Sequence, residues 1–268
     1  MIKCGITGFK GNLGKTFLKV NNKFSYSKFK GDVSEKKQLE NWLKSNKFDI
    51  IIHLAALVPT HKVDNNFKKA LDVNYKGTKY LIDGIIKYQK DMNWFFFAST
   101  SHVYPYQLKK ISEKNKTKSI SKYGETKLKA EDYILKRFKN LKYNFCIGRI
   151  FSIFDNKEKS FFAPSLVKKI QRGPKIMVLE NLIHYRDFLS TKQISKIIFL
   201  LWKKKYSGII NIGSGKKTDL RKLAKFFGDK YKKKILFKKN KPTYHIANIS
   251  KLKKLGFQSK NLNFGSFF

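Results

Sequence analysis

Along the first 150 residues, apolar runs typical of strands alternate with stretches whose apolar residues have helical spacing. Short apolar runs predict strands, and the stretches between them repeat apolar residues at helical spacing, as Leu39, Trp42 and Leu43 do. The pattern predicts strands over 3–7, 24–27, 49–54, 94–98 and 145–150, and helices from about 13 and over 34–45, 66–87 and 123–137. This alternation indicates βαβ units, so we expect an α/β fold with a doubly wound parallel sheet.

Beyond residue 150 the alternation is less regular. Helices are predicted over 163–171, 194–202 and 220–227, and strands over 175–179 and 208–212. The chain has no internal repeat and no linker-like segment. Its 268 residues suit one large domain, or a main domain with a small annex.

Composition supports a folded chain. Hydrophobic residues make up 41% of the sequence, enough for a sizeable core despite a formal charge of +41. Cys4 and Cys146 each lie in a short apolar run, and we expect buried thiols in a reducing compartment. No apolar stretch approaches the roughly 18 residues of a membrane span, and the N-terminus lacks a signal-peptide pattern. These features predict a cytoplasmic protein without a membrane span.

The basic charge invites a nucleic-acid hypothesis, with a pI near 10.1. Only five of the 59 basic residues are arginine, and the lysines are spread along the whole chain. Nucleic-acid surfaces cluster their charge, and planar phosphate recognition favours arginine. We therefore interpret the charge as a solvated lysine surface, with nonspecific attraction to polyanions at low salt and no specific nucleic-acid partner.

A glycine-rich turn, Thr7-Gly8-Phe9-Lys10-Gly11-Asn12-Leu13-Gly14, links the first strand to its helix. Glycines let the backbone approach a pyrophosphate closely, and the helix N-terminus offers unpaired N–H groups. The tail Gly14-Lys15-Thr16 resembles a phosphate-binding P-loop, but Phe9 stands where that motif needs glycine. The turn therefore predicts a dinucleotide site.

The type of dinucleotide is less clearly specified. No acidic residue closes the second strand, where NAD enzymes often bind the ribose 2′-hydroxyl. Ser27-Lys28-Phe29-Lys30 stands there instead, with Lys10 in the glycine turn. Ammonium groups can bind a 2′-phosphate, which favours NADP slightly, and NAD remains open.

Groups that can move protons follow the fourth predicted strand. It ends in Ser99-Thr100-Ser101-His102, and Tyr123 and Lys127 then share one helix face at i and i+4. An ammonium beside a phenol lowers the tyrosine pKa, and a strand-end hydroxyl such as that of Thr100 can hold a substrate oxygen. This arrangement predicts proton transfer on a carbonyl or alcohol while a nicotinamide moves the hydride.

Histidine has two readings in this sequence. His102 is a candidate second acid/base, and a hydrogen-bonded structural imidazole is the alternative. The remaining histidines show no metal-ligand spacing, so no metal site is expected; they are His53, His61, His184 and His245.

These motifs resemble the extended short-chain dehydrogenase/reductases, specifically the nucleotide-sugar epimerases, dehydratases and reductases. The resemblance runs over nearly the whole chain. It rests on Thr7–Gly14, Asp32, His53–Ala56, Asn74, Ser99–Tyr104, Tyr123–Lys127, Arg186–Phe188, 211–215 and 250–257.

The resemblance implies a role for each matching residue. Tyr123 would be the acid/base, Lys127 would bind the nicotinamide ribose, and Thr100 would contact the sugar oxygen. The implied cofactor-binding residues are Thr7, Gly8, Gly11, Asn12, Leu13, Gly14, Asp32, Leu54, Ala55, Ala56, Asn74, Ser99, Tyr123 and Lys127. The substrate would be a nucleotide-diphosphate sugar, with Arg186 on its diphosphate; the other implied contacts are Ser101, His102 and Ser152.

The resemblance also narrows the reaction. Dehydratases of the group carry Asp-Glu directly after the catalytic Thr, where this chain has Ser101 and His102. Reduction of a 4-keto (6-deoxy) sugar is then favoured, and 4-epimerisation with retained NAD is the alternative. A non-catalytic dinucleotide-binding regulator is a further alternative, because Ser152 and Lys192 replace a usual Asn and a usual Asp.

The implied architecture is a Rossmann-type sheet of about seven strands with a small C-terminal substrate-binding domain. The Rossmann domain would comprise 1–150 plus about 186–213. The small domain would comprise about 151–185 and 214–268. The resemblance further implies a homodimer and a role in polysaccharide biosynthesis.

Overall fold

The computed structural model describes residues 1–58, 60–139, 141, 143–155, 162–180, 182–238 and 241–259. The chain divides into two compact units, each described by itself. Unit 1 comprises Met1–Pro105, Lys116–Ile150 and Lys192–Ile210. Unit 2 comprises Tyr106–Asn115, Phe151–Thr191 and the chain from Asn211 onward.

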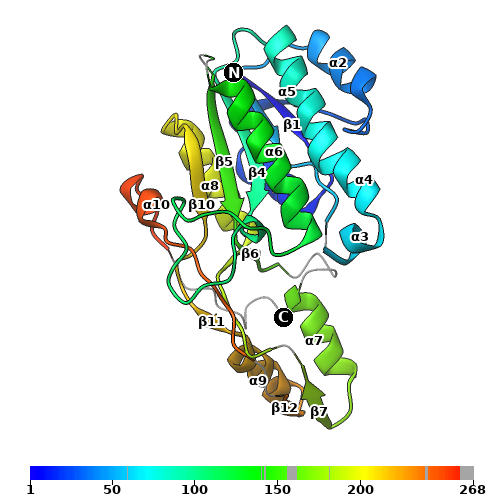
Figure 1. Ribbon diagram of the computed structural model, residues 1–268, viewed down its shortest axis with the longest axis vertical. Helices are drawn as coiled ribbons and strands as arrows, with labels where there is room; N and C mark the ends of the chain where they lie inside the picture. The colour runs from blue at the N-terminus through cyan, green and yellow to red at the C-terminus, as the bar shows by residue number, and fades with distance from the viewer. Residues whose placement is uncertain are drawn as a thin grey trace. The chain divides into compact units, whose positions relative to one another are not determined.

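A six-stranded sheet forms the centre of unit 1, in the order β10-β5-β4-β3-β1-β2 (Figure 1). Its strands are β1 (Ile2–Thr7), β2 (Phe24–Lys28), β3 (Ile50–His53), β4 (Trp94–Thr100), β5 (Asn144–Ile150) and β10 (Gly208–Ile212). The neighbouring pairs from β2 to β5 are all parallel. The sequence-based prediction of a doubly wound, Rossmann-type parallel sheet is therefore confirmed, with six strands in the described chain.

Helices cover the faces of this sheet. They are α1 (Asn12–Val20), α2 (Lys36–Lys44), α3 (Thr60–Asn65), α4 (Phe67–Leu71), α5 (Gly77–Tyr88), α6 (Lys122–Phe138) and α8 (Thr191–Lys203). α2, α5 and α6 lie side by side (Figure 1), over a core that includes Leu43, Ile82, Phe95 and Ile134. At the β2 edge, Phe24 contacts Phe17 of α1 and Trp202 of α8.

The helix predicted over 66–87 is interrupted. A π-helical turn, η1 (Asp72–Lys76), separates α4 from α5. It places Asn74 in a fully buried position. The interruption is not visible in the sequence, because the apolar spacing is almost continuous through the turn.

Unit 2 is built from short elements around its own core. These are β6 (Ser152–Ile153), α7 (Phe162–Arg172), β7 (Ile176–Leu179), β8 (Tyr185–Arg186), β9 (Phe188–Leu189), β11 (Thr218–Asp219), α9 (Leu220–Lys230), β12 (Lys234–Phe237), β13 (Tyr244–His245) and α10 (Ser250–Lys254). α7 packs against α9, and their core includes Leu166, Ile170 and Phe227. The strands pair as β11-β8-β13, β12-β7 and β6-β9.

Two further predictions concern the burial of the cysteine thiols and the presence of a membrane-spanning helix. Cys4 and Cys146 are buried free thiols, as predicted. Within the described ranges, no helix is long and apolar enough to cross a membrane.

Candidate active site

The glycine turn lies at the carboxyl end of β1, where α1 begins. Gly8 has a φ of +72°, and a Cβ there would lie 2.4 Å from the backbone nitrogen of Ala55. A Cβ at Gly14 would lie 2.3 Å from the carbonyl oxygen of Gly8, so α1 packs directly on the turn. At Gly11 the closest approach would be 3.3 Å. Gly8 and Gly14 are thus required by packing, whereas Gly11 leaves the helix end uncovered.

The start of α1 fits an anionic ligand. Its N-cap, Gly11, supplies no side-chain hydrogen bond, and its first turn carries no acidic residue. The amide nitrogen Nδ2 of Asn12 is buried without a hydrogen-bond partner among the described residues. Unpaired donors at a helix N-terminus bind phosphate groups, so these residues fit a dinucleotide pyrophosphate.

Gly14→Ala is expected to lower the free energy of unfolding by about 1–3 kcal/mol, because the added methyl group must displace backbone atoms. Urea unfolding of the ligand-free protein measures this change. Gly11→Ala, which adds the same methyl group with more room, is the matched control and should cost less than half as much. Equal losses would contradict the packing assigned to Gly14.

The end of β2 lies beside the glycine turn, because β2 pairs directly with β1. Lys28 and Lys30 are exposed there, and Phe29 between them is buried. The carboxylate of Asp32 accepts hydrogen bonds from the backbone nitrogen and the hydroxyl of Ser34. These bonds lower the pKa of Asp32, so an ionised acid and two ammonium groups occupy this end of the sheet.

The residues predicted to line the dinucleotide differ in exposure. Leu13, Leu54, Ala55 and Ala56 are half-buried around the turn. The side chain of Asn74 instead accepts from the Leu57 nitrogen at 2.7 Å and donates to Thr126. Thr7, Asn74 and Ser99 are all buried and bonded within the protein, so these side chains hold the loops of the predicted site.

Tyr123 lies in the first turn of α6, which begins at the N-cap Ser121. This helix packs against β4 and the short 3-10 turn η2 (Ser101–Val103). The rings of Tyr123 and His102 meet edge to face, with centroids 6.0 Å apart. The backbone nitrogen of His102 donates to Thr100 Oγ1 at 3.2 Å. The structure thus brings Thr100, His102 and Tyr123 together within unit 1.

Lys127 is 1% exposed, on the same face of α6 as Tyr123. Its Nζ lies 4.1 Å from the centre of the Phe97 ring. Burial lowers the pKa of Lys127 to about 7, while the nearby Glu131 raises it. Burial raises the pKa of Tyr123. The spacing of Tyr123 and Lys127 predicted a lowered tyrosine pKa; the structure gives the opposite direction, and desolvation is its cause.

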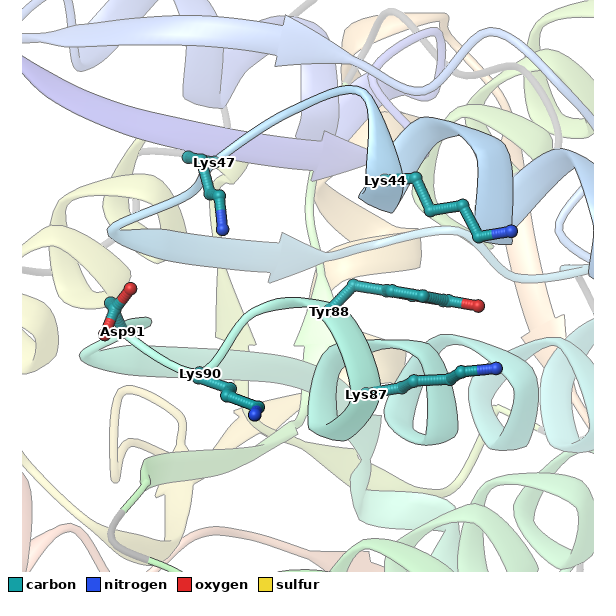
Figure 2. A pocket seen from close by; sticks show the side chains of 6 residues that line it. All are labelled: Lys44, Lys47, Lys87, Tyr88, Lys90 and Asp91. Carbon is teal, nitrogen blue, oxygen red and sulfur yellow. The ribbon is translucent and has the colours of Figure 1, made fainter.

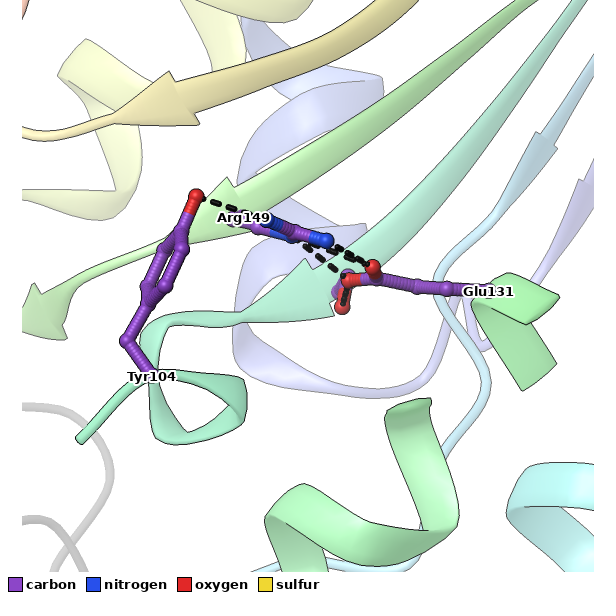
Figure 3. Close-up of polar contacts among 4 residues, drawn as sticks. Tyr104, Glu131 and Arg149 are labelled. Carbon is purple, nitrogen blue, oxygen red and sulfur yellow. Dashed lines mark hydrogen bonds and ion pairs between the residues drawn. The ribbon is translucent and has the colours of Figure 1, made fainter. Parts of the chain in front are cut away.

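A buried charge network, missed by the sequence analysis, lies one turn beyond Lys127 (Figure 3). The Arg149 guanidinium donates to both carboxylate oxygens of Glu131 and, at 2.7 Å, to the hydroxyl of Tyr104. Ser99 donates its hydroxyl to Glu131 as well. The network ties α6 to the ends of β4 and β5. The single arginine inside the apolar run 145–150 was the signal that could have revealed it.

A pocket lies at the opposite end of the strands from the glycine turn, beside the loops that lead into β3 and β4. Figure 2 shows this pocket of about 440 Å³, lined by Lys44, Lys47, Lys87, Tyr88, Lys90 and Asp91. Lys44 and Lys87 stand in the last turns of α2 and α5. Cations at helix C-termini are stabilised by the backbone carbonyls there, which accounts for these lysines without a ligand.

The predicted substrate contacts Ser152 and Arg186 belong to unit 2. Arg186 donates to the carbonyl oxygens of Tyr185 and Thr243, and its guanidinium lies over the Tyr106 ring at 5.0 Å. The Ser152 nitrogen donates to the carbonyl oxygen of Asp187. Thr100, Tyr123 and Lys127 belong to unit 1.

Asp187 organises the backbone beside Arg186. Its carboxylate accepts hydrogen bonds from Ser214, Gly215 and Ala247. Burial raises the pKa of Asp187 despite these bonds. In the part of the chain that the structure describes, no group of three or more His, Cys, Asp or Glu side chains gathers as a metal site.

Sequence comparison gives one family and several relatives. The profile described as "NAD dependent epimerase/dehydratase family" matches residues 6–213. A dTDP-D-glucose 4,6-dehydratase of Dictyostelium discoideum is 29% identical over 220 residues, which cover 76% of this chain and 49% of that protein. A GDP-6-deoxy-D-talose 4-dehydrogenase of Aggregatibacter actinomycetemcomitans is 28% identical, and the match covers 80% of this chain and 75% of that protein. A UDP-glucose 4-epimerase of Mycoplasma genitalium is 25% identical, and the match covers 95% of this chain and 83% of that protein.

The chain spans about half the length of the dehydratase it matches. Among solved structures, MoeE5 in complex with UDP-glucose and NAD has a TM-score of 0.85 at 19% identity, covering 99% of this chain and 96% of that one. RMD from Pseudomonas aeruginosa complexed with NADPH also has a TM-score of 0.85 at 19% identity, covering 98% and 95%. At these identities the likeness establishes the fold.

Proposed function

The chain belongs to the NAD-dependent epimerase/dehydratase family, and on this premise we propose that it reduces a 4-keto (6-deoxy) sugar carried on a nucleotide diphosphate. The cluster of Thr100, His102 and Tyr123 at the end of β4 carries this proposal. The deoxytalose 4-dehydrogenase among the relatives, named for redox chemistry at C4, supports it. Ser101 and His102 stand where dehydratases of the resembled group carry Asp-Glu, which disfavours elimination.

The chain's own residues would handle the proton. A bound nicotinamide supplies the hydride for reduction at C4. Tyr123 donates its phenolic proton to the C4 oxygen, and Thr100 holds that oxygen with its hydroxyl. The buried ammonium of Lys127 would bind the ribose of the dinucleotide and favour the phenolate left on Tyr123. His102 would return a proton to Tyr123; its ring lies edge to face with the tyrosine ring, and its Nδ1 lies 3.0 Å from Ser121 Oγ.

Unit 2 would supply the remaining substrate contacts. We propose that Arg186 binds the diphosphate through its planar guanidinium and that Ser152 contacts the same group. The division into a dinucleotide-binding and a substrate-binding domain is part of this proposal, as is a homodimer. Sedimentation of the purified protein measures its oligomeric state.

Incubation with nucleotide 4-keto-6-deoxy sugars tests the function directly. Consumption of NADPH or NADH, with a 4-hydroxy product, is the expected result. A 4-epimerase with retained NAD would instead turn over nucleotide 4-hydroxy sugars without added cofactor. The likeness to UDP-glucose 4-epimerase, which covers 95% of the chain, favours this second candidate. Binding of a dinucleotide without turnover of either sugar class would leave the non-catalytic regulator.

For the cofactor we propose a preference for NADP. Lys28 and Lys30 are exposed at the end of β2, beside the glycine turn. The double variant Lys28→Glu/Lys30→Glu is expected to shift the kcat/KM ratio of NADPH to NADH at least about tenfold toward NADH, because it removes charge-assisted contacts to the 2′-phosphate. Steady-state rates with each cofactor measure the ratio.

A matched pair of lysines controls for net charge. Lys47→Glu/Lys90→Glu makes the same charge change in the pocket beside the loops that lead into β3 and β4, at the opposite end of the strands. It should leave the cofactor ratio within about twofold, because the charges there are distant and screened. A wild-type preference for NADH would overturn the proposed preference.

A further inference from the structure

A buried imidazole lies under the glycine turn. His53, the last residue of β3, is fully buried. Its Nδ1 lies 2.6 Å from Thr7 Oγ1, and its Nε2 lies 3.0 Å from Thr78 Oγ1. Thr7 directly precedes Gly8 of the turn, and Thr78 belongs to α5. The His53 side chain therefore connects the glycine turn to α5, a helix that packs on a face of the sheet.

The hydrogen bonds fix which ring nitrogen carries the proton. The Thr78 hydroxyl donates to the carbonyl oxygen of Asn74 at 2.7 Å. Because a hydroxyl has a single proton, Thr78 Oγ1 must accept from His53 Nε2, which therefore carries hydrogen. In the neutral ring Nδ1 is then the acceptor and takes the proton of the Thr7 hydroxyl. Thr7 Oγ1 in turn accepts from the Ala55 nitrogen at 3.3 Å.

We propose that His53 is a positioning residue of the dinucleotide site: held as the Nε2–H tautomer, it clamps Thr7 and thereby keeps the glycine turn against the backbone after β3. The backbone of the turn lies directly on the segment that the clamp would hold, because a Cβ on Gly8 would collide with Leu54 and Ala55. The inference rests on the proposed function only in taking a dinucleotide as the ligand of the turn.

The clamp requires an uncharged ring. A protonated Nδ1 would become a second donor facing Thr7, whose hydroxyl would have to reverse. The charged group facing His53 is Lys127, and the Phe97 ring lies against both side chains. Burial and this ammonium lower the pKa of His53 to about 3. The ring is therefore neutral from pH 5 to 8.

Two amide substitutions separate the two halves of the clamp. His53→Asn places an amide oxygen near the position of Nδ1 and can still accept from Thr7. His53→Gln is one methylene longer, so its amide reaches toward Thr78 and leaves Thr7 without an acceptor. Both variants lose the ring and its contact with Phe97.

Fluorescence titration with NADPH and with NADH measures the dissociation constants. We expect His53→Gln to raise the constant of the better-bound dinucleotide about tenfold, and His53→Asn at most about threefold. Equal changes in the two variants, or no change in either, would overturn the inference. If the wild-type protein binds neither dinucleotide, the proposed function fails instead. The clamp is then tested by the protonation state of the His53 ring, which does not depend on a bound ligand.

The ring is observed by ¹⁵N nuclear magnetic resonance of the labelled wild-type protein. We expect the shifts of a neutral Nε2–H imidazole between pH 5 and 8, and an Nδ1–H tautomer or titration near pH 6.5 would contradict the clamp. A folded-state pKa below the unfolded value gives stability that is present at neutral pH and lost in acid. The unfolding equilibrium constant should rise roughly 25-fold more from pH 7 to 5 in wild type than in His53→Asn.

Discussion

Tyr123→Phe is expected to lower kcat by a factor of about 10²–10⁴, because the variant lacks the only proton that the phenol can pass to the C4 oxygen. The ring, its contact with His102 and the packing of α6 on η2 all remain. Dinucleotide affinity should therefore stay within about threefold of wild type. The measurement is single-turnover reduction of a nucleotide 4-keto sugar, combined with fluorescence titration of the cofactor.

Tyr133→Phe is the matched control for this experiment. Tyr133 lies on the same helix, and its hydroxyl donates to Asp83 away from the β4 end. Its loss should leave kcat within about twofold, since the removed bond is partly exposed. A Tyr123→Phe protein that turns over at the wild-type rate would remove Tyr123 from the chemistry and strengthen the non-catalytic alternative.

Arg149→Met is expected to destabilise the fold by about 3–5 kcal/mol, because it leaves the Glu131 carboxylate buried without its cation. Arg149 is 4% exposed and Glu131 is fully buried, so water cannot replace the lost partner. The double variant Glu131→Gln/Arg149→Met removes both charges and should recover at least half of the loss. Urea unfolding of four proteins, the wild type, Arg149→Met, Glu131→Gln and the double variant, completes a double-mutant cycle.

The surface pair Lys36–Glu40, with an exposed lysine and a half-buried glutamate, serves as the comparison for this cycle. Its charged atoms are 3.9 Å apart at the surface of α2, where ion pairs contribute little. Lys36→Met should change the free energy of unfolding by less than about 0.5 kcal/mol. A double variant at Glu131 and Arg149 that is less stable than Arg149→Met alone would contradict the assignment of the loss to an unpaired charge.

The strand pattern of unit 1 could be predicted because its strands are long and apolar. A continuous apolar run of four or more residues can be recognised in a sequence, as it is for β3 and β4. The two-residue strands β8, β11 and β13 leave none, and tertiary pairing alone defines them. The clustering of Tyr106–Asn115 with unit 2 likewise depends on contacts distant in sequence.

The positions of the candidate catalytic residues could be predicted from their spacing in the sequence, but their surroundings could not. The i and i+4 positions of Tyr123 and Lys127 predicted a shared helix face, which the structure has. Spacing says nothing about burial, and burial sets the direction of both pKa values. The partners of His53 come from β1 and α5, so the sequence showed the residue without its hydrogen bonds.

Strand β2 ends the sheet, and its outer backbone groups could pair with a strand from another molecule. Such exposed edges seed aggregation unless they are short or carry charge. β2 is five residues long, is preceded by Lys23 and ends at Lys28, with Lys30 just beyond. The lysines that we propose bind the 2′-phosphate of NADP would thus also protect this edge against aggregation. Exchanging them for glutamate preserves this protection, whereas neutral residues would leave the border of the sheet open to self-association.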